Sequence, residues 1–112
     1  MPSFLTCITT EIQYMIRHMI PSEFEWDEAK AEANLAKHGI PFEAAVVAFD
    51  DADRLLTIDD RFDYGEERWN LIGIVDGVLL TISYTMRGDV CRIISARSAS
   101  RKEREAYASH SL

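Results

Sequence analysis

The stretch that decides the fold is Trp69–Tyr84, with the sequence WNLIGIVDGVLLTISY. It holds two runs rich in β-branched and aromatic residues, and the pair Asp76-Gly77 separates them. Asp-Gly between two such runs is typical of a two-residue β-hairpin turn, because both turn positions require positive φ angles. We therefore expect two antiparallel strands, at Trp69–Val75 and Val78–Tyr84.

Two further strands are expected around this hairpin. A short apolar run at Leu55–Ile58 precedes it, and the β-branched run Val90–Ala96 follows it after a turn around Met86–Asp89. Side chains alternate between the two faces of a regular strand, so Arg92 and Arg97 should point to opposite faces unless the last strand contains a bulge. The sequence thus predicts a four-stranded antiparallel sheet.

Helical patterns flank the predicted sheet on both sides. Asp27 is suited to cap a helix that reaches about Lys37. A second helix follows Pro41, since apolar residues recur after it at i, i+3, i+4 and i+7. Ser100 and Glu103 have the spacing of a capping box for a C-terminal helix. The predicted order is two helices, four strands and one helix, which is an α+β fold.

Length and composition favour one small globular domain. Of the 112 residues, 47% are hydrophobic, which is enough for one core and too little for two ordinary domains. We expect residues 23–112 to form this domain and residues 1–22 to form an accessory or poorly ordered extension. The extension lacks the pattern of a signal peptide or membrane span, and Cys7 and Cys91 suggest no disulfide framework, so we expect a cytoplasmic protein with no membrane contact.

Basic residues are concentrated in the second half of an acidic chain. The net charge is −7 at pH 7, but residues 61–112 hold eight basic and seven acidic residues, whereas residues 1–60 hold four and twelve. Because nucleic acids are bound chiefly through Lys and Arg, we expect any such binding at the C-terminal sheet.

Several arginines fall at or near strand ends, where long side chains reach a shared site. They are Arg68, Arg87, Arg92 and Arg97. The planar guanidinium group binds phosphate oxygens bidentately and stays charged at all working pH values, which favours RNA phosphate as the ligand. The alternative is that these arginines form ordinary surface ion pairs with carboxylates such as Glu103.

Three other side chains are candidates for chemistry or substrate contact. His38 is suited to general acid or base catalysis, although a histidine at a helix end also serves as a favourable charge. Tyr84 and Tyr107 are weaker candidates for substrate binding, because such tyrosines more often cap a core. No Walker loop, dinucleotide-binding glycine pattern, zinc-protease pattern or cysteine pair occurs, so we expect no metal and no cofactor.

Four segments together resemble the BrnT family of bacterial type II toxins. They are FEWDEAKAEANLAKHGIPFEAA, ERWNLIG, YTMRGD and RIISARSASRKEREAY, and they occur in the family's order between Phe24 and Tyr107. The resemblance implies a RelE-like α+β fold, an RNA-cleaving activity that slows growth, and a hetero-oligomer with a neutralising BrnA antitoxin. Operator DNA would then be contacted only through the antitoxin.

The resemblance also implies a set of site residues. Matching positions are His38, Glu67, Arg68, Arg87 and Arg97, with Tyr84 and Tyr107 as weaker candidates. We expect Arg68 and Arg87 to clamp phosphate, Arg97 to add a third cation, and His38 or Glu67 to transfer protons. A non-catalytic module that binds a protein through the same basic strip is the competing hypothesis. A DNA-binding domain ranks below both, because no recognition helix or dimer motif is evident.

Overall fold

The computed structural model describes residues 21, 23–59 and 65–110, and the structural statements below concern these residues. They form an α+β fold, as expected. The predicted extension at residues 1–22 lies outside the described part of the chain apart from Pro21.

The hairpin predicted from Asp76-Gly77 is confirmed. Strand β3 spans Arg68–Val75, and strand β4 spans Val78–Arg87 antiparallel to it. Asp76 and Gly77 have φ angles of 49° and 81°, the left-handed values that a type I′ turn requires at both positions.

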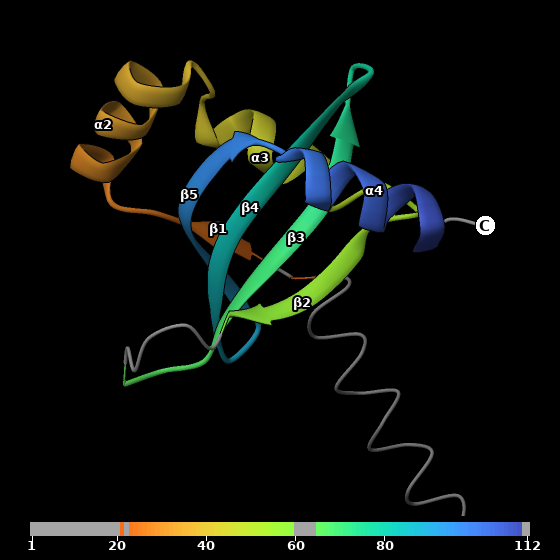
Figure 1. Ribbon diagram of the computed structural model, residues 1–112. Helices are drawn as coiled ribbons and strands as arrows, with labels where there is room; N and C mark the ends of the chain where they lie inside the picture. Colours follow the sequence, from red (N-terminus) through yellow and green to blue (C-terminus); the bar gives the residue numbers. More distant parts are fainter. Residues whose placement is uncertain (1–20, 22, 60–64, 111–112) are drawn as a thin grey trace, which may run out of the picture.

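The sheet has five strands in the order β1-β5-β4-β3-β2 (Figure 1). The other strands are β1 at Glu23–Glu25, β2 at Leu55–Asp59 and β5 at Val90–Ser98. Strands β2 to β5 pair antiparallel as predicted, but β1 pairs parallel with β5. The four-stranded antiparallel prediction is therefore corrected to a mixed, five-stranded sheet. Strand β1 has three residues, too few to show a β pattern in the sequence. It is a strand only because it pairs with β5, which comes much later in the chain.

The three helices are α2 at Glu28–His38, α3 at Phe42–Ala48 and α4 at Arg101–His110. The predicted cap of α2 is present, since the Asp27 carboxylate accepts a hydrogen bond from the Lys30 N–H at 3.0 Å. The helix ends at Gly39, whose φ of 72° is left-handed and whose N–H donates to the Leu35 carbonyl.

The capping box predicted for α4 is confirmed as well. The Glu103 N–H donates to the Ser100 hydroxyl oxygen at 3.2 Å, and the Ser100 N–H donates to the Glu103 carboxylate at 2.8 Å. This reciprocal pair satisfies two backbone donors that the first turn of a helix leaves free.

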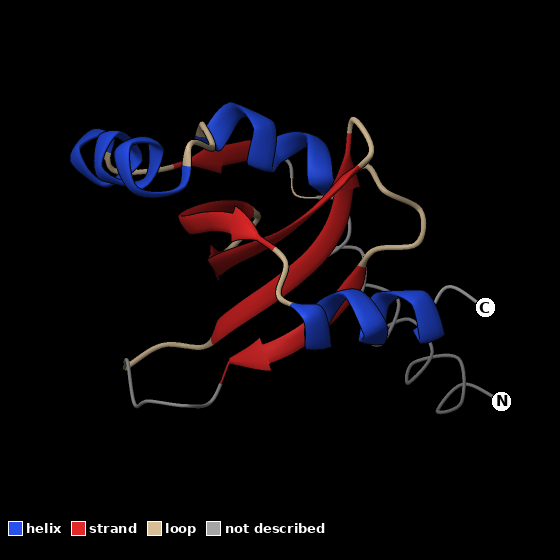
Figure 2. Ribbon diagram, turned by 45° about the horizontal axis from the view of Figure 1, so that its top comes forward, coloured by secondary structure: helices blue, strands red, loops and turns tan. Residues whose placement is uncertain are grey.

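The hydrophobic core lies between the sheet and α3. Its buried members are Phe42, Ala45, Ala48, Phe49, Leu71, Leu80, Ile82, Tyr84, Cys91, Ile93 and Ala96. Helix α3 approaches β3 closely at Gly73, where a Cβ atom would stand 2.7 Å from the Ala48 carbonyl oxygen. Figure 2 shows α2 and α3 on one side of the sheet and α4 on the other. Within the described residues, each helix is too short or too polar to cross a bilayer.

Strand β5 contains a bulge. Ile93 pairs with Tyr84 and Ser95 pairs with Ser83, so two adjacent residues of β4 face three of β5 and Ile94 is the additional one. A bulge of this kind shifts the alternation of side chains by one residue along the strand.

The bulge overturns the expectation for the two arginines of β5. Arg92 pairs with Thr85 and Arg97 pairs with Thr81. Thr81 and Thr85 are four residues apart in β4, so they point to the same face of the sheet, and their partners do too. Arg92 and Arg97 thus lie on one face, where a regular strand would have separated them.

A buried asparagine of α2 covers part of the outer edge of β5. Strand β1 pairs with β5 only at residues 90–92. Farther along, the Asn34 side-chain amide donates to the Ala96 carbonyl at 2.9 Å and accepts from the Ala96 N–H at 3.1 Å. It also donates to the Ile40 carbonyl at 3.0 Å, and it is 7% exposed. Asn34 therefore replaces one residue of a neighbouring strand and fixes α2 against the sheet.

Candidate functional site

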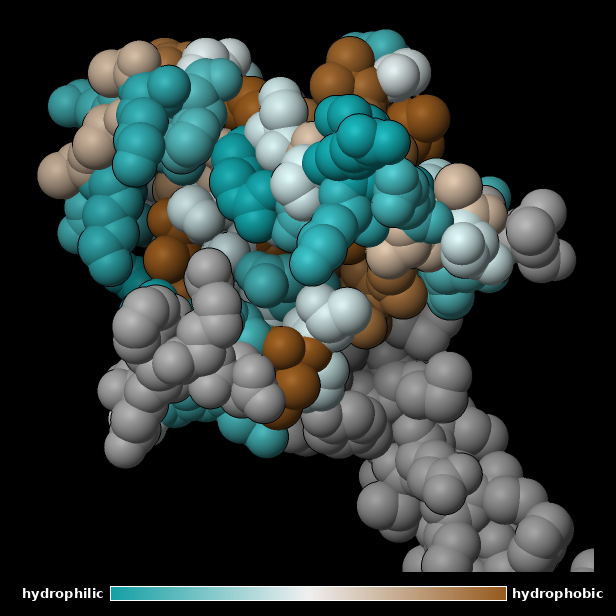
Figure 3. All heavy atoms as spheres, in the orientation of Figure 1, coloured by the Kyte–Doolittle hydropathy of each residue, from teal (hydrophilic) through white to brown (hydrophobic). Residues whose placement is uncertain are grey.

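The face of the sheet that points away from α2 and α3 is polar, and we call it the polar face. Core residues such as Leu71, Ile82 and Tyr84 point toward α3, so the residues that alternate with them point to the polar face. In Figure 3, hydrophilic side chains gather over the middle of the sheet and along α4, on the side seen in Figure 1. Three rows of residues cross this face from strand to strand.

The outer row joins acidic and basic side chains across all five strands. The strand pairs place Glu25 beside Arg92, Arg92 beside Thr85, and Asp59 beside Arg68. Arg68 precedes Trp69, the partner of Tyr84, and so lies next to Thr85. The Thr85 hydroxyl donates to the Glu67 carbonyl at 2.6 Å, which fixes this end of β3 against β4.

Glu25 binds two of the arginines at this end of the sheet. Its carboxylate lies 3.4 Å from the Arg92 guanidinium and 4.0 Å from that of Arg87. The Arg87 side chain is 55% exposed and that of Arg92 is 27% exposed. The contacts are loose and open to water, so an anion of higher charge can compete with Glu25 for both arginines.

The central row holds neutral hydrogen-bonding groups. It consists of Ser95, Ser83, Asn70 and Thr57, which pair in that order across β5, β4, β3 and β2. The Ser83 hydroxyl donates to the Asn70 side-chain oxygen at 2.7 Å. The row therefore offers hydroxyl and amide groups between the arginines of the two rows beside it.

The third row contains Arg97, which is held by the first turn of α4. Two of its nitrogens bind the two carboxylate oxygens of Glu103 at 2.7 and 2.9 Å. Burial favours the neutral form of Glu103, but the hydrogen bonds from Arg97 and from the Ser100 N–H outweigh it and lower the pKa of Glu103 to about 2. Glu103 thus stays ionised and cannot act as a base near neutral pH.

The arginines of the outer and third rows are far enough apart to contact different phosphates. Thr85 and Thr81, their partners in β4, are four residues apart, which corresponds to about 13 Å along a strand. Arg68 and Arg92 are two strand spacings apart, or about 10 Å. The polar face therefore carries arginines on both sides of a neutral polar centre, each beside a carboxylate.

His38 and Glu67 lie at two different borders of this face. His38 is exposed at the end of α2, where it lines a shallow hollow of about 220 Å³ together with Ser95 of the central row. Glu67 is exposed immediately before β3, next to Arg68. Of the two candidates for proton transfer, His38 is the one that borders the central row.

The two tyrosines lie apart from the arginines. Tyr84 is fully buried in the core, with its ring centroid 5.1 Å from that of Phe49. The Tyr107 hydroxyl donates to the Asp51 carboxylate at 2.6 Å, and this hydrogen bond, with burial as a smaller cause, raises the pKa of Tyr107 to about 12. Asp51 also accepts from the Ile74 N–H at 2.9 Å, so Tyr107 ties α4 to the end of β3.

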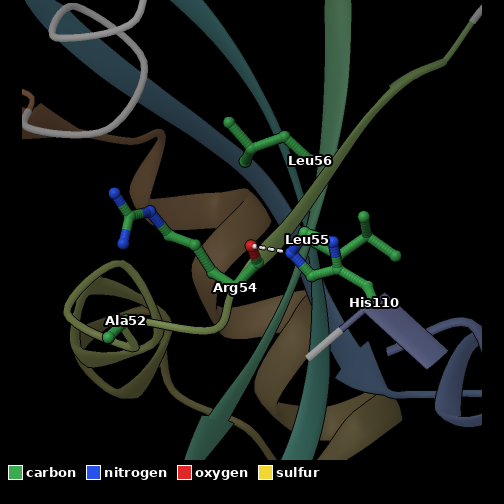
Figure 4. A pocket seen from close by; sticks show the side chains of 5 residues that line it. All are labelled: Ala52, Arg54, Leu55, Leu56 and His110. Atoms are coloured by element: carbon green, nitrogen blue, oxygen red, sulfur yellow. Dashed lines mark hydrogen bonds between the residues drawn. The ribbon is translucent and has the colours of Figure 1, made fainter. Parts of the chain in front are cut away.

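A second hollow, of about 380 Å³, lies beside β2, and its lining includes Arg54, Leu55 and Leu56 (Figure 4). His110 of α4 closes one side, with its Nε2 atom 3.2 Å from the Arg54 carbonyl oxygen. The Arg54 guanidinium donates to the Asp51 carbonyl at 2.7 Å. This hollow contains none of the residues predicted for the site.

Strand pairing adds residues to the site that sequence reasoning did not assign. A regular strand would place Arg92 on the face opposite Arg97, and the predicted site residues include neither Arg92 nor the hydroxyl and amide groups of the central row. No local signal identifies Ile94 as a bulge residue, so Arg92 could not be assigned to the face of Arg97. The available signal for the central row was the alternation of polar residues in β4, at Thr81, Ser83 and Thr85.

The family comparison agrees with the resemblance found in the sequence. A model of the family described as "Ribonuclease toxin, BrnT, of type II toxin-antitoxin system" matches residues 26–103. No curated protein matches the chain. The matched region includes every residue of the polar face named above except Glu25.

Proposed function

Because the chain belongs to the BrnT family of type II ribonuclease toxins, we propose that it cleaves RNA on its polar face. The observation that supports this most directly is the bulge, since it brings Arg92 to the face that carries Arg68 and Arg97. Cleavage slows growth by inhibiting translation, and a cognate BrnA-like antitoxin neutralises the chain.

The reaction that fits these groups is attack by the ribose 2′-hydroxyl on the adjacent phosphorus. The 2′-oxygen forms a bond to phosphorus and loses its proton to a base, while the bond to the 5′-oxygen breaks and that oxygen takes up a proton. The products are a 2′,3′-cyclic phosphate and a 5′-hydroxyl. No metal ion is required, because cations of the protein stabilise the added negative charge on phosphorus.

Arginines at the outer end of the sheet are proposed to clamp the reacting phosphate. Arg68 and Arg87 take this role, and Arg92 joins them because it pairs with Thr85, the neighbour of Arg68, and shares Glu25 with Arg87. Phosphate carries several acceptor oxygens and binds guanidinium bidentately. An exposed pair such as Arg87–Glu25 contributes about 0–1 kcal/mol, so exchanging Glu25 for phosphate costs little.

His38 is proposed to transfer the proton, with Arg97 as the cation at the far side of the central row. His38 lines the hollow that contains Ser95. Arg97 is held in a bidentate pair by Glu103 and is thereby oriented over the third row. Glu67 is the second candidate for proton transfer, since it precedes Arg68 in the chain.

The antitoxin is proposed to bind an acidic surface of the toxin through a basic segment. Helix α2 exposes Glu28 and Glu32, and helix α3 exposes Glu43. Opposite charges across such an interface speed association and make it sensitive to salt. Copurification with the antitoxin that survives charge reversal at these three glutamates would contradict this version of the interface.

A non-catalytic interaction module is the second candidate function. Three arginines of the polar face already have carboxylate partners, Arg87 and Arg92 with Glu25 and Arg97 with Glu103, as an ordinary ion-pair network would. Such a module would bind a protein and leave RNA intact.

The experiment that separates the two functions uses matched RNA and DNA oligonucleotides of one sequence. A ribonuclease of the proposed type cleaves the RNA and leaves the DNA intact, because only RNA has the 2′-hydroxyl. Products that end in a 2′,3′-cyclic phosphate support the mechanism. If neither strand is cleaved by the folded chain free of antitoxin, the interaction module is the correct function.

A further inference from the structure

One face of α2 is basic and borders the polar face, although the helix belongs to the acidic half of the chain. Residues Lys30, Ala33, Asn34, Lys37 and His38 line the hollow beside β5, together with Ile94 and Ser95. They recur at i, i+3, i+4, i+7 and i+8, the spacing of one helix face.

The acidic residues of α2 lie on the other side of the helix. Glu28 and Glu32 stand about 160° from Lys30 around the helix axis, because each residue adds about 100°. Both are exposed and neither lines the hollow. The helix thus separates its charges, and its cationic side is turned toward β5.

The two lysines of the hollow form no ion pair with any residue that the structure describes. Among the described residues, no carboxylate lies within ion-pair distance of Lys30 or Lys37, in contrast to Arg92 and Arg97 of the polar face. A lysine without a carboxylate partner loses no ion pair when it binds an external anion. The hollow is therefore more available to an anion than the arginine rows are.

The hollow and the polar face are continuous through one residue. Ser95 lines the hollow and also pairs with Ser83 in the central row. Asn34 holds α2 in place beside Ser95, because its amide binds both backbone groups of Ala96. An anionic chain that lies on the central row can thus continue over the edge of β5 onto α2.

From this arrangement we propose that Lys30 and Lys37 bind the phosphates of single-stranded RNA that flank the bond cleaved on the polar face. The two lysines are two helical turns apart, about 10 Å along the axis, so they reach different phosphates. The proposal rests on the proposed function for the location of the cleaved bond. It adds a binding track that determines affinity and substrate length and leaves the chemical step unchanged.

The test compares Lys30→Gln/Lys37→Gln with Arg101→Gln/Lys102→Gln, a control that removes two exposed charges from α4. Binding is measured by fluorescence anisotropy on a labelled 12-nucleotide DNA, which has the phosphates and no 2′-hydroxyl, over a series of salt concentrations. Circular dichroism confirms that both variants are folded.

For Lys30→Gln/Lys37→Gln, called the hollow variant below, we expect Kd to rise about tenfold at low salt. The magnitude of the slope of log K against log salt should fall by about 1.4, since each of the two phosphate contacts contributes about 0.7. The control should keep at least nine tenths of the parent slope. In cleavage assays, the hollow variant should match the parent on a dinucleotide RNA, whose single phosphate is the one cleaved, and lose about tenfold in kcat/KM on the 12-nucleotide RNA.

The outcomes separate this proposal from the proposed function. If the parent cleaves no RNA but the hollow variant still loses affinity and slope, the binding track stands and the ribonuclease function fails. If the parent cleaves RNA and the hollow variant keeps the parent slope, the binding track is wrong. A variant that binds RNA as the parent does but no longer binds an acidic protein partner also overturns it.

Discussion

Arg92 and Arg97 lie on the same face of the sheet, although five positions separate them in β5. The additional residue Ile94 shifts the alternation of side chains between them by one position. Arg92 therefore pairs with Thr85 and Arg97 pairs with Thr81, two residues on the same face of β4. The proposed site depends on this relationship, because without the bulge one of the two guanidinium groups would point into the core.

Removal of the outer-row arginines should abolish most of the cleavage activity. For Arg68→Ala and for Arg92→Ala, we expect kcat/KM on RNA to fall about a hundredfold, the usual cost of losing one positioned donor to the transition state. The control is Arg101→Ala, since Arg101 is exposed on α4 and bound to Glu105. Parent activity in a folded Arg68→Ala/Arg92→Ala double variant would show that the clamp is assigned incorrectly.

Replacement of His38 should separate the two candidates for proton transfer. We expect His38→Gln to lower kcat by at least about a hundredfold, since general acid–base catalysis contributes on that scale. Glu67→Gln should stay near the parent rate, because Glu67 lies at the end of β3 and does not line the hollow beside Ser95. The reverse pattern of rates would assign the role to Glu67.

The Arg97–Glu103 pair should make the free energy of unfolding depend on pH in the acidic range. The pKa of Glu103 falls from its ordinary value of 4.5 to about 2 in the folded chain. The contribution of ionised Glu103 to the free energy of unfolding is therefore complete above pH 4.5 and is lost as the pH falls toward 2. Partial exposure reduces it to about 1–2 kcal/mol.

Urea unfolding at pH 6 and pH 3.5 measures this contribution. We expect the free energy of unfolding to fall less between these two values in Glu103→Gln than in the parent. Glu105→Gln is the matched control, since Glu105 lies on the same helix and its side chain is mostly exposed. Identical losses in the parent and Glu103→Gln would contradict the assignment.

Asn34→Ala should destabilise the fold. The substitution leaves the buried N–H and carbonyl of Ala96 without their side-chain partners, and we expect the free energy of unfolding to fall by about 2–4 kcal/mol. The same measurement on Lys37→Ala, an exposed position of α2, should give a change within about 0.5 kcal/mol. Equal changes in the two variants would mean that Asn34 does not anchor α2.

Chelation should leave the reaction unchanged. The proposed mechanism stabilises the phosphorane charge with guanidinium groups, so an excess of EDTA should alter kcat/KM by less than about twofold. Loss of activity with EDTA that is restored by Mg²⁺ would require a metal ion in the mechanism.

Features that depend on neighbours in the chain were predicted from the sequence. The Asp76-Gly77 hairpin, the Asp27 cap of α2 and the Ser100–Glu103 capping box involve residues at most four positions apart. Their geometry follows from local backbone preferences and short side-chain hydrogen bonds, so the residue types are sufficient to predict them. The family membership was accessible for the same reason, because its motifs are contiguous segments.

Features that depend on distant residues were decided only by the tertiary structure. The bulge at Ile94, the parallel strand β1 and the Asn34–Ala96 hydrogen bonds join positions up to 67 residues apart, as in the pair Glu25 and Arg92. Each of these features forms because a distant segment supplies hydrogen-bonding or packing partners. The sequence around the feature does not show which segment that is. The sequence by itself therefore identified the arginines that are candidates for binding RNA, and strand pairing decided which of them share a face.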